Sequence, residues 1–203
     1  SDGAGTLLFY SDGITVWDAT HAPMPNGLGL MGDWSATQSA TAVRKPGNPN
    51  IYYIFTVPNL GGAAGLRYSE IDMTLNFGLG DITATKNILL QTDISEKVSV
   101  VRHSNGTDFW VIAQSSLNNT FYVYLVNSSG VAFDHTNSVG TGPAFLADAP
   151  GQLRSCDNRL AIAYQSSRLV EIYDFNNTTG SISTPKPLTP MSIFGVYGLE
   201  FSP

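Results

Sequence analysis

A paired-strand pattern occurs four times along this chain, and it constrains the fold more than any other feature. In its first copy, residues 6–18 (TLLFYSDGITVWD), an apolar run and an alternating run flank the turn Ser11–Gly13. Short aromatic and β-branched runs on either side of a glycine-containing turn are typical of a β-hairpin. The chain therefore begins with an all-β unit, which it then repeats.

The spacing of the repeats predicts the fold class. The equivalent strands centre on Phe9, Tyr53, Trp110 and Ile162, which lie 44, 57 and 52 residues apart. A period near 50 residues fits a four-stranded propeller blade with loop insertions better than a helical repeat. We therefore expect an all-β fold: a single β-propeller domain or propeller fragment over residues 1–203, built of four-stranded antiparallel blades, about four of them present.

The segments around each hairpin repeat as well. A first strand, at the innermost position of its blade, is expected before three of the hairpins, at residues 40–44, 98–102 and 152–154. A partner strand follows the aromatic-rich strand in every unit, at residues 14–18, 66–72, 121–126 and 170–175. Turns rich in Gly and Asn then lead to fourth segments such as 131–133 and 181–183. Consecutive strands joined by short turns predict an up-and-down meander in each blade.

The two ends of the sequence leave two architectures open. The chain begins on the second strand of a unit, and residues 196–201 (VYGLEF) have the pattern of a first strand. If these residues pair beside the hairpin 6–18, four blades form a closed ring that hides its edge strands. The alternative, which we favour, is a section of a larger ring of about six to eight blades.

Composition narrows the class of protein. The chain is 42% hydrophobic and only 13% charged, and its net charge is -6. A negative charge disfavours nucleic-acid binding, which depends on clustered Lys and Arg. The apolar runs are far shorter than the roughly 20 residues that span a bilayer. Low charge with abundant Asn, Ser, Thr and Gly leads us to expect an extracellular protein, and the single Cys156 is expected to be a small buried residue.

Several stretches in order carry a resemblance to a known family. The segments LLFYSDGITVWDATHAPMPNGLGLMG, TQSATAVRKPGNPNIYYIFTV, LRYSEIDMTLNFGLGD, VVRHSNGTDFWVIA and YGLEFSP resemble secreted β-propeller proteins of Bacteroidetes-type bacterial surfaces. Those proteins are often followed by PKD domains and a gliding-motility sorting domain. The resemblance implies a seven-bladed, WD-repeat-like or YVTN-like ring, export by type IX secretion and an outer-surface location, within a longer multidomain chain. It brings no catalytic residues.

Three arginines are the leading candidates for a binding site. Arg44, Arg102 and Arg154 occupy the same place near the ends of three successive inner strands, and they are half of the six arginines in the chain. Inner strands converge on a propeller axis, so these guanidinium groups are expected to crowd one mouth of the channel. Because like charges repel, an anionic ligand or an acidic loop would stabilise them. His103 adjoins Arg102 and joins the candidates. The alternative is that each arginine bonds to a neighbouring blade.

Catalytic and metal signals are weaker. A glycosidase needs two facing carboxylates, and only Glu200 and Glu96 fall in or near expected inner strands. The run Gly27–Gly32 matches G-x-G-x-x-G, but it lacks the strand, helix and acidic residue of a dinucleotide site. The three histidines show no zinc spacing. No cofactor is expected, and calcium at an Asp- and Asn-rich loop stays an open alternative.

These observations lead to one main expectation for function. We expect a non-catalytic extracellular platform for binding or adhesion, which recognises a glycan or a protein partner at one propeller face. The alternative from another class is a propeller glycoside hydrolase or lyase that acts on polysaccharide. A structural spacer within a large surface protein is the third alternative.

Overall fold

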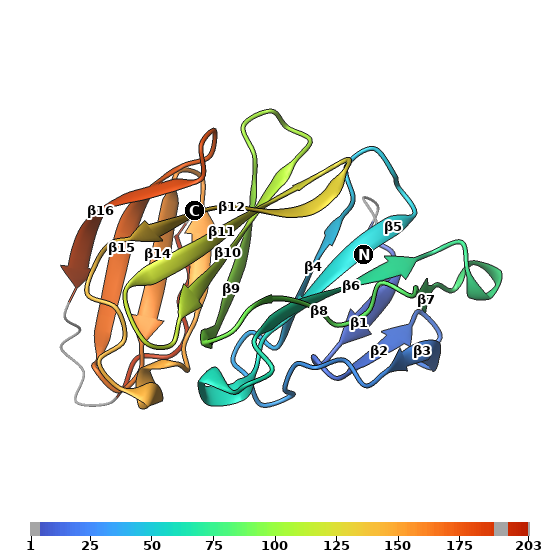
Figure 1. Cartoon of the computed structure of the whole chain (residues 1–203), viewed down its shortest axis with the longest axis horizontal. Helices are drawn as coiled ribbons and strands as arrows, with labels where there is room; N and C mark the ends of the chain where they lie inside the picture. The colour runs from blue at the N-terminus through green and yellow to red at the C-terminus, as the bar shows by residue number, and fades with distance from the viewer. Residues whose placement is uncertain (1–4, 189–194, 203) are drawn as a thin grey trace.

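The computed structural model describes residues 5–188 and 195–202. It is built almost entirely of antiparallel strands (Figure 1). The strands are β1 (Phe9–Ser11), β2 (Thr15–Asp18), β3 (Pro23–Leu28), β4 (Ala40–Arg44), β5 (Ile51–Thr56), β6 (Leu66–Asp72), β7 (Asp81–Ile82), β8 (Ile88–Gln91), β9 (Ile94–Arg102), β10 (Phe109–Ser115), β11 (Thr120–Asn127), β12 (Gly130–Ser138), β13 (Leu153–Cys156), β14 (Arg159–Tyr164), β15 (Leu169–Asn176) and β16 (Ser181–Leu188). Three short 3-10 helices, η1 (Asn59–Gly61), η2 (Asn76–Gly78) and η3 (Leu146–Asp148), lie in connections.

Four sheets are arranged as a fan, with β1–β3 at one end and β13–β16 at the other (Figure 1). Within each sheet the strands follow one another in chain order, as in β9-β10-β11-β12 and β13-β14-β15-β16. The first strands β4, β9 and β13 contact one another across neighbouring sheets. This is a β-propeller fold with about four blades, and it confirms the fold class predicted from the repeat spacing.

Two sheets depart from four strands. The first has three, in the order β1-β2-β3, in agreement with a chain that begins on the second strand of a blade. In the second sheet, the outer position is divided between β7 and β8, which both pair with β6. Ile82 lies opposite Ile71, and Leu89 lies opposite Arg67. Between them, Thr83 donates to the Glu70 carbonyl at 2.9 Å and Thr85 accepts the Glu70 N–H at 2.8 Å, so the chain stays beside β6 with an irregular register and the outer position is divided into two strands.

Proline marks the outer edges of the end sheets. β3 and β16 are both outermost strands, and they carry Pro23, Pro25, Pro185 and Pro187. Proline has no N–H to give to a ladder, so it is tolerated at a sheet edge and not in a central strand. The central strands, by contrast, are aliphatic and aromatic.

The hydrophobic core lies between successive sheets. Phe55, Val98 and Val111 belong to a buried cluster that joins the β4–β8 sheet to the β9–β12 sheet. Trp110 and Tyr173 belong to a second cluster, which joins that sheet to β13–β16. Full burial of such side chains contributes roughly 1.5–3 kcal/mol each, so face-to-face packing of blades is the main source of stability.

The segment 195–202 does not pair beside the first hairpin of its own chain. It contains no strand, and the Gln152 backbone N–H donates to the carbonyl oxygen of Tyr197 at 3.1 Å. The Leu199 N–H donates to Oε1 of Gln152 at 2.9 Å. Gln152 directly precedes β13, at the opposite end of the fan from β1 (Figure 1). The four-blade ring closed by this chain's own ends is therefore not the arrangement found.

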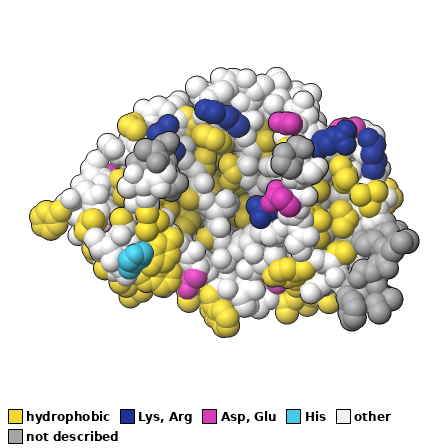
Figure 2. Space-filling view, turned by 180° about the vertical axis from the view of Figure 1, so that it is seen from behind, with side chains coloured by type: hydrophobic (Ala, Val, Ile, Leu, Met, Phe, Trp, Pro, Cys, Tyr) yellow, Lys and Arg dark blue, Asp and Glu magenta, His cyan; other side chains and the backbone are white. Residues whose placement is uncertain are grey.

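The surface carries few charges. On the face seen in Figure 2, basic and acidic side chains form small separate groups in a largely uncharged surface. No helix in the described part of the chain is long and apolar enough to cross a membrane.

Candidate functional site

A basic hollow lies where two neighbouring inner strands end. It has a volume of about 310 Å³. Arg44 is the last residue of β4 and Arg102 is the last residue of β9, and both line the hollow together with Lys45 and Phe109. The turn 46–49 and the residues Gly106 and Thr107 close its sides. Three cations thus gather at one face of a protein whose net charge is negative.

Arg44 is the least constrained of these cations. Its side chain is exposed, and within the described ranges it makes no hydrogen bond or ion pair. It also borders a second, larger groove of about 530 Å³ beside β1. A guanidinium group has five donors in a planar fork that matches carboxylate and phosphate oxygens. Arg44 is therefore free to bind an anion from either hollow.

Arg102 is partly held by its own turn. Its Nε donates to the carbonyl oxygen of Gly106 at 3.0 Å, which fixes the direction of the side chain and leaves the terminal nitrogens for a ligand. Lys45 lies over the ring of Tyr53, with Nζ 5.8 Å from the ring centre. A cation–π contact of this kind orients the ammonium group without neutralising it. None of the three cations has an acidic partner among the described residues.

Arg154 and His103 take no part in the hollow. Nε of Arg154 donates to Oε1 of Gln152 at 3.3 Å, on the same strand end. The His103 ring packs on Trp110 at 5.1 Å, and its Nδ1 accepts the backbone N–H of Asn105 at 3.0 Å. The structure thus brings together two of the three predicted arginines. Arg102 and Arg154 each form a hydrogen bond within their own blade.

The sequence interpretation missed two lining residues of the hollow, Lys45 and Phe109. For Lys45, the sequence contained one usable signal, the basic pair Arg44-Lys45 directly before the turn 46–49.

The two glutamates that an enzyme was expected to use are not paired. Glu96 is only 2% exposed, and its carboxylate accepts N–H groups of Thr37 and Leu60 and the Thr37 hydroxyl. Glu200 is exposed in the segment 195–202. Neither residue lines the basic hollow or the larger groove. Glu96 therefore has a structural position, and a facing pair of catalytic carboxylates is not formed by these two residues.

A buried lysine lies on the same strand as Glu96. Lys97 is fully buried, and its Nζ donates to the carbonyl oxygens of Asp148 and, at 2.9 Å, Ala149. It also lies over the ring of Tyr164 at 5.3 Å. Burial lowers the pKa of Lys97 to about 7, against the opposing effect of the charges on Asp148 and Glu96. The ammonium group holds the connection that carries η3, and Lys97 does not line the basic hollow.

The glycine-rich run Gly27–Gly32 is an inter-strand loop. The N–H of Leu30 donates to the carbonyl of Ile14, and the N–H of Gly32 donates to the carbonyl of Gly13, both at 3.0 Å. A side chain at Gly32 would meet the Gly13 oxygen at 2.6 Å. Glycine is therefore required for close approach to the first hairpin. These N–H groups are used by the backbone and are not directed at a phosphate.

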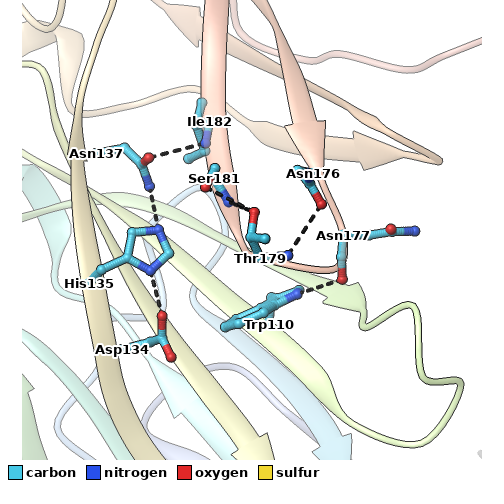
Figure 3. A network of polar contacts seen from close by, with 9 residues as sticks. All are labelled: Trp110, Asp134, His135, Asn137, Asn176, Asn177, Thr179, Ser181 and Ile182. Atoms are coloured by element: carbon cyan, nitrogen blue, oxygen red, sulfur yellow. Dashed lines mark hydrogen bonds and ion pairs between the residues drawn. The ribbon is translucent and has the colours of Figure 1, made fainter.

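Polar side chains also join the third and fourth sheets (Figure 3). His135 lies between Asp134 and Asn137, with Nδ1 2.6 Å from the Asp134 carboxylate. Asn137 accepts the N–H of Ile182 at 3.1 Å, which ties β12 to β16.

Across the described ranges, no three His, Cys, Asp or Glu side chains gather as metal ligands. Cys156 is exposed at the end of β13, so the expectation of a buried thiol is wrong.

Comparisons with known proteins find structural neighbours only. No family model matches the chain, and no curated protein matches it. A candidate 6-phosphogluconolactonase from Bacteroides uniformis is similar at a TM-score of 0.51 and 15% identity, over 89% of this chain and 50% of that one. A periplasmic gluconolactonase from Pseudomonas aeruginosa is similar at 0.45 and 15%, over 73% and 39%. The chain thus spans half or less of the length of these neighbours, and the likeness at a TM-score of 0.51 supports the propeller fold.

One of these neighbours corrects the main functional expectation. The Bacteroides uniformis propeller is described as a candidate 6-phosphogluconolactonase, and not as an adhesion protein. The expectation of a non-catalytic platform for binding or adhesion is therefore contradicted, and the enzymatic alternative is taken up below as a proposal. The sequence alone could not decide between a binding platform and an enzyme. The repeat pattern indicates only how the strands pack, and the same fold is shared by proteins with many functions.

Proposed function

We propose that the chain is part of a propeller hydrolase that acts on an anionic or carboxylate-generating sugar derivative, of which a sugar lactone is the simplest case. The observation that carries the proposal is the unpaired guanidinium of Arg44, which lines one hollow with Lys45 and Arg102. Separate cations brought together without an acid repel one another until an anion binds between them. The hollow therefore favours a substrate, or a product, that bears negative charge.

The chemistry of lactone opening suits this arrangement. Water adds to the ring carbonyl and gives up a proton, and the carbonyl oxygen becomes negatively charged. The ring C–O bond then breaks, the ring oxygen takes a proton to become a hydroxyl, and the new carboxylic acid ionises and releases one proton to solvent. Guanidinium donors placed beforehand near such an oxygen stabilise the charge that develops. The terminal nitrogens of Arg102, whose Nε is anchored on Gly106, are placed in this way. Phe109 lines the same hollow and provides an apolar surface for a sugar ring.

The likeness to solved lactonases supports the reaction class and leaves the substrate to experiment. Hydrolysis of glucono-δ-lactone and of its 6-phosphate is measured by proton release in a pH-stat, and binding of gluconate and 6-phosphogluconate is measured by calorimetry. In the double variant R44Q/R102Q, loss of charged hydrogen bonds lowers kcat/KM and affinity by roughly 10–100-fold. R168Q changes an exposed arginine outside the hollow and serves as the matched control.

Two outcomes would contradict the proposal. In the first, the wild-type protein neither hydrolyses a lactone faster than buffer alone nor binds a sugar acid. In the second, the R44Q/R102Q variant keeps the rates and the affinity of the wild type.

We also propose that the chain works outside the cytoplasm, as part of a larger secreted protein of the Bacteroidetes-type propeller class. The low charge and the Asn-, Ser- and Thr-rich turns support this location. Fractionation of cells that express the whole parent protein, followed by detection of this domain, tests it. A signal confined to the cytoplasm contradicts it.

A further inference from the structure

A β-bulge on β12 brings together two of the polar side chains drawn in Figure 3. In the pairing with β11, Val123 lies opposite His135 and Tyr124 lies opposite Phe133, so Asp134 is an extra residue in β12. Successive side chains of a regular strand point to opposite faces, but a bulge changes the direction of a side chain locally. Asp134 and His135 can therefore contact each other although they are adjacent in the chain.

The contacts of His135 fix the position of its proton. Its Nδ1 lies 2.6 Å from a carboxylate oxygen of Asp134, and an ionised carboxylate only accepts hydrogen bonds. Its Nε2 lies 3.0 Å from the side-chain nitrogen of Asn137, and an amide NH2 group only donates. His135 is therefore neutral in this arrangement, with its proton on Nδ1 and the lone pair of Nε2 directed at Asn137.

The same amide group holds the neighbouring sheet. Oδ1 of Asn137 accepts the backbone N–H of Ile182 at 3.1 Å, and Ile182 on β16 is only 5% exposed. The direction of the amide is thus set at both ends, because its oxygen faces Ile182 and its NH2 group faces His135. β12 and β16 are the outermost strands of the third and fourth sheets. This chain of hydrogen bonds therefore joins the outer edges of two blades.

A second contact holds the β15–β16 turn from another side. The carbonyl oxygen of Asn177 accepts the Nε1–H of Trp110 at 2.9 Å and the backbone N–H of Ser104 at 3.0 Å. An indole, a backbone amide and a carbonyl do not change their charge near neutral pH. The turn 176–180 and the strand that follows it are thus held by one joint that can respond to pH, at Asn137, and by one that cannot, at Asn177.

We propose that His135, with Asp134 and Asn137, forms a pH-sensitive latch between the third and fourth sheets, and that protonation of the ring releases β16 from β12 while the contact at Asn177 stays closed. On protonation, Nε2 becomes a donor and faces the NH2 group of Asn137, and two donors cannot share a hydrogen bond. A half-turn of the amide restores an acceptor for His135. It also points the NH2 group at the Ile182 N–H, which then has lost its acceptor.

The rotated amide is favoured because a hydrogen bond from a charged donor is stronger than one from a backbone N–H. The protonated latch therefore keeps the His135 contact and gives up the contact to β16. Protonation of histidine is a general way to change an interface inside a protein. Here the interface is the outer seam between two blades, and the inference does not depend on the lactonase proposal.

The His135 ring lies against an uncharged part of the fourth sheet. A Cβ atom at Gly180 would lie 3.1 Å from Cε1 of this ring, 3.1 Å from Val123 and 3.2 Å from Trp110, so the turn, β10 and β11 meet here. The His135 and Asp134 side chains are 28% and 39% exposed. A proton thus reaches the ring from solvent, and the ion pair that forms is weakened by screening.

Other titratable groups lie on the elements packed around the latch. His103 stacks on Trp110 with ring centres 5.1 Å apart, and its Nδ1 accepts a backbone N–H of its own turn. On the fourth sheet, Asp174 and Lys186 lie 3.9 Å from each other. Histidine is the type of side chain among these that ordinarily changes its charge between about pH 5 and 8. The experiment must therefore separate the latch from His103.

Amide hydrogen exchange tests the latch in the unmodified protein. Protection factors, which correct for the direct effect of pH on exchange, are measured by NMR between about pH 8 and 5. The protection of Ile182 should fall by roughly fivefold to tenfold as one hydrogen bond is lost, with the same midpoint as the His135 ring signals. The protection of Ser104 should not change. At pH 8 the ring nitrogen shifts should show the proton on Nδ1.

Variants separate the latch from its surroundings. H135Q removes the titrating ring and should make the protection of Ile182 independent of pH, whereas H103Q should keep the fall seen in the wild type. In N137D, a carboxylate accepts both the Ile182 N–H and the Nε2–H of the charged ring, so acid should no longer lower the protection of Ile182. Thermal melting confirms that each variant is folded.

Four results would overturn the proposal. The first is a ring that carries its proton on Nε2 at pH 8, and the second is a protection of Ile182 that stays constant while His135 titrates. The third is a fall that persists in H135Q. The fourth is an equal fall at Ser104, because the whole turn would then open and the contact at Asn177 would not hold.

Discussion

The carboxylate of Glu96 accepts two hydrogen bonds from Thr37, which precedes it by 59 residues: the backbone N–H at 2.7 Å and the hydroxyl at 2.8 Å. Its second oxygen accepts the N–H of Leu60 at 3.0 Å. One buried side chain thus joins β9, η1 and the connection that leads into β4. The position that looks catalytic in the sequence is a junction between two blades.

Replacement of Glu96 should therefore destabilise the fold. In E96A, three donors lose a charged acceptor in a buried site, and we expect the free energy of unfolding to fall by about 2–4 kcal/mol. Urea denaturation followed by tryptophan fluorescence measures the change. D157N alters an exposed carboxylate in a turn and should stay within about 0.5 kcal/mol of wild type. A small effect of E96A would show that Thr37 and Leu60 find water instead.

Lys97 should make stability rise with pH above neutrality. Its pKa is about 7 in the native state and near 10.5 in the unfolded chain. Between these values the unfolded state binds the proton more tightly, so the free energy of unfolding increases with pH, by at most about 1.4 kcal/mol per pH unit. Below about pH 7 the lysine is charged in both states, and the full destabilisation from its burial is present.

Urea denaturation at intervals from pH 6 to 9.5 checks this slope. K97M removes the titrating group and should flatten the profile, whereas K186M, at an exposed lysine, should keep it. Above about pH 10 the trend should reverse. Burial raises the pKa of Tyr124 to about 12, so the unfolded state then loses protons first. If the free energy of unfolding of K97M rises with pH as steeply as that of the wild type, Lys97 is not the group responsible for the slope.

The strands were predictable because local pattern and tertiary packing agree. Residues 40–44 and 66–72 were predicted with the bounds that β4 and β6 have. The division between β7 and β8 was not predictable, because it depends on an irregular register of residues 83–87 against β6 and not on their own pattern. Residues 196–201 have a strand pattern but lie beside Gln152 unpaired. The alternating pattern of residues 196–201 shows that the segment can form a strand, but it does not show which strand it pairs with.

The candidate site was predictable only in part. Equivalent positions on repeats brought Arg44 and Arg102 to one hollow, as the spacing predicted. Arg154 has the equivalent position, but its side chain donates to Gln152 Oε1, which also accepts the backbone N–H of Leu199. Burial of Lys97 depends on carbonyl groups 51 and 52 residues further along the chain. Contacts over such separations leave no local signal in the sequence.

The turn of the first hairpin depends on Asp12. Its Oδ1 accepts the N–H groups of Ile14 at 3.0 Å and Thr15 at 2.9 Å. Loss of this local acceptor in D12A should lower the free energy of unfolding by about 1 kcal/mol, whereas D12N keeps an acceptor oxygen and should lose less than half of that. Equilibrium unfolding of the two variants in parallel separates the acceptor from its charge. Equal losses would mean that charge, not the turn geometry, is what matters.

The contact between Trp110 and the β15–β16 turn offers a last test of how the sheets are joined. Trp110 is 3% exposed, and its indole Nε1 donates to the carbonyl oxygen of Asn177 at 2.9 Å, across the boundary between two blades (Figure 3). W110F keeps most of the ring but leaves the carbonyl without its donor, and we expect a loss of about 1–3 kcal/mol. W34F changes a tryptophan that is 71% exposed and should have little effect. Hydrogen exchange at residues 176–180 should speed up in W110F alone, because the turn then loses its anchor on the neighbouring sheet. Unchanged exchange in that turn would show that packing of the ring, and not the hydrogen bond, holds the blades together.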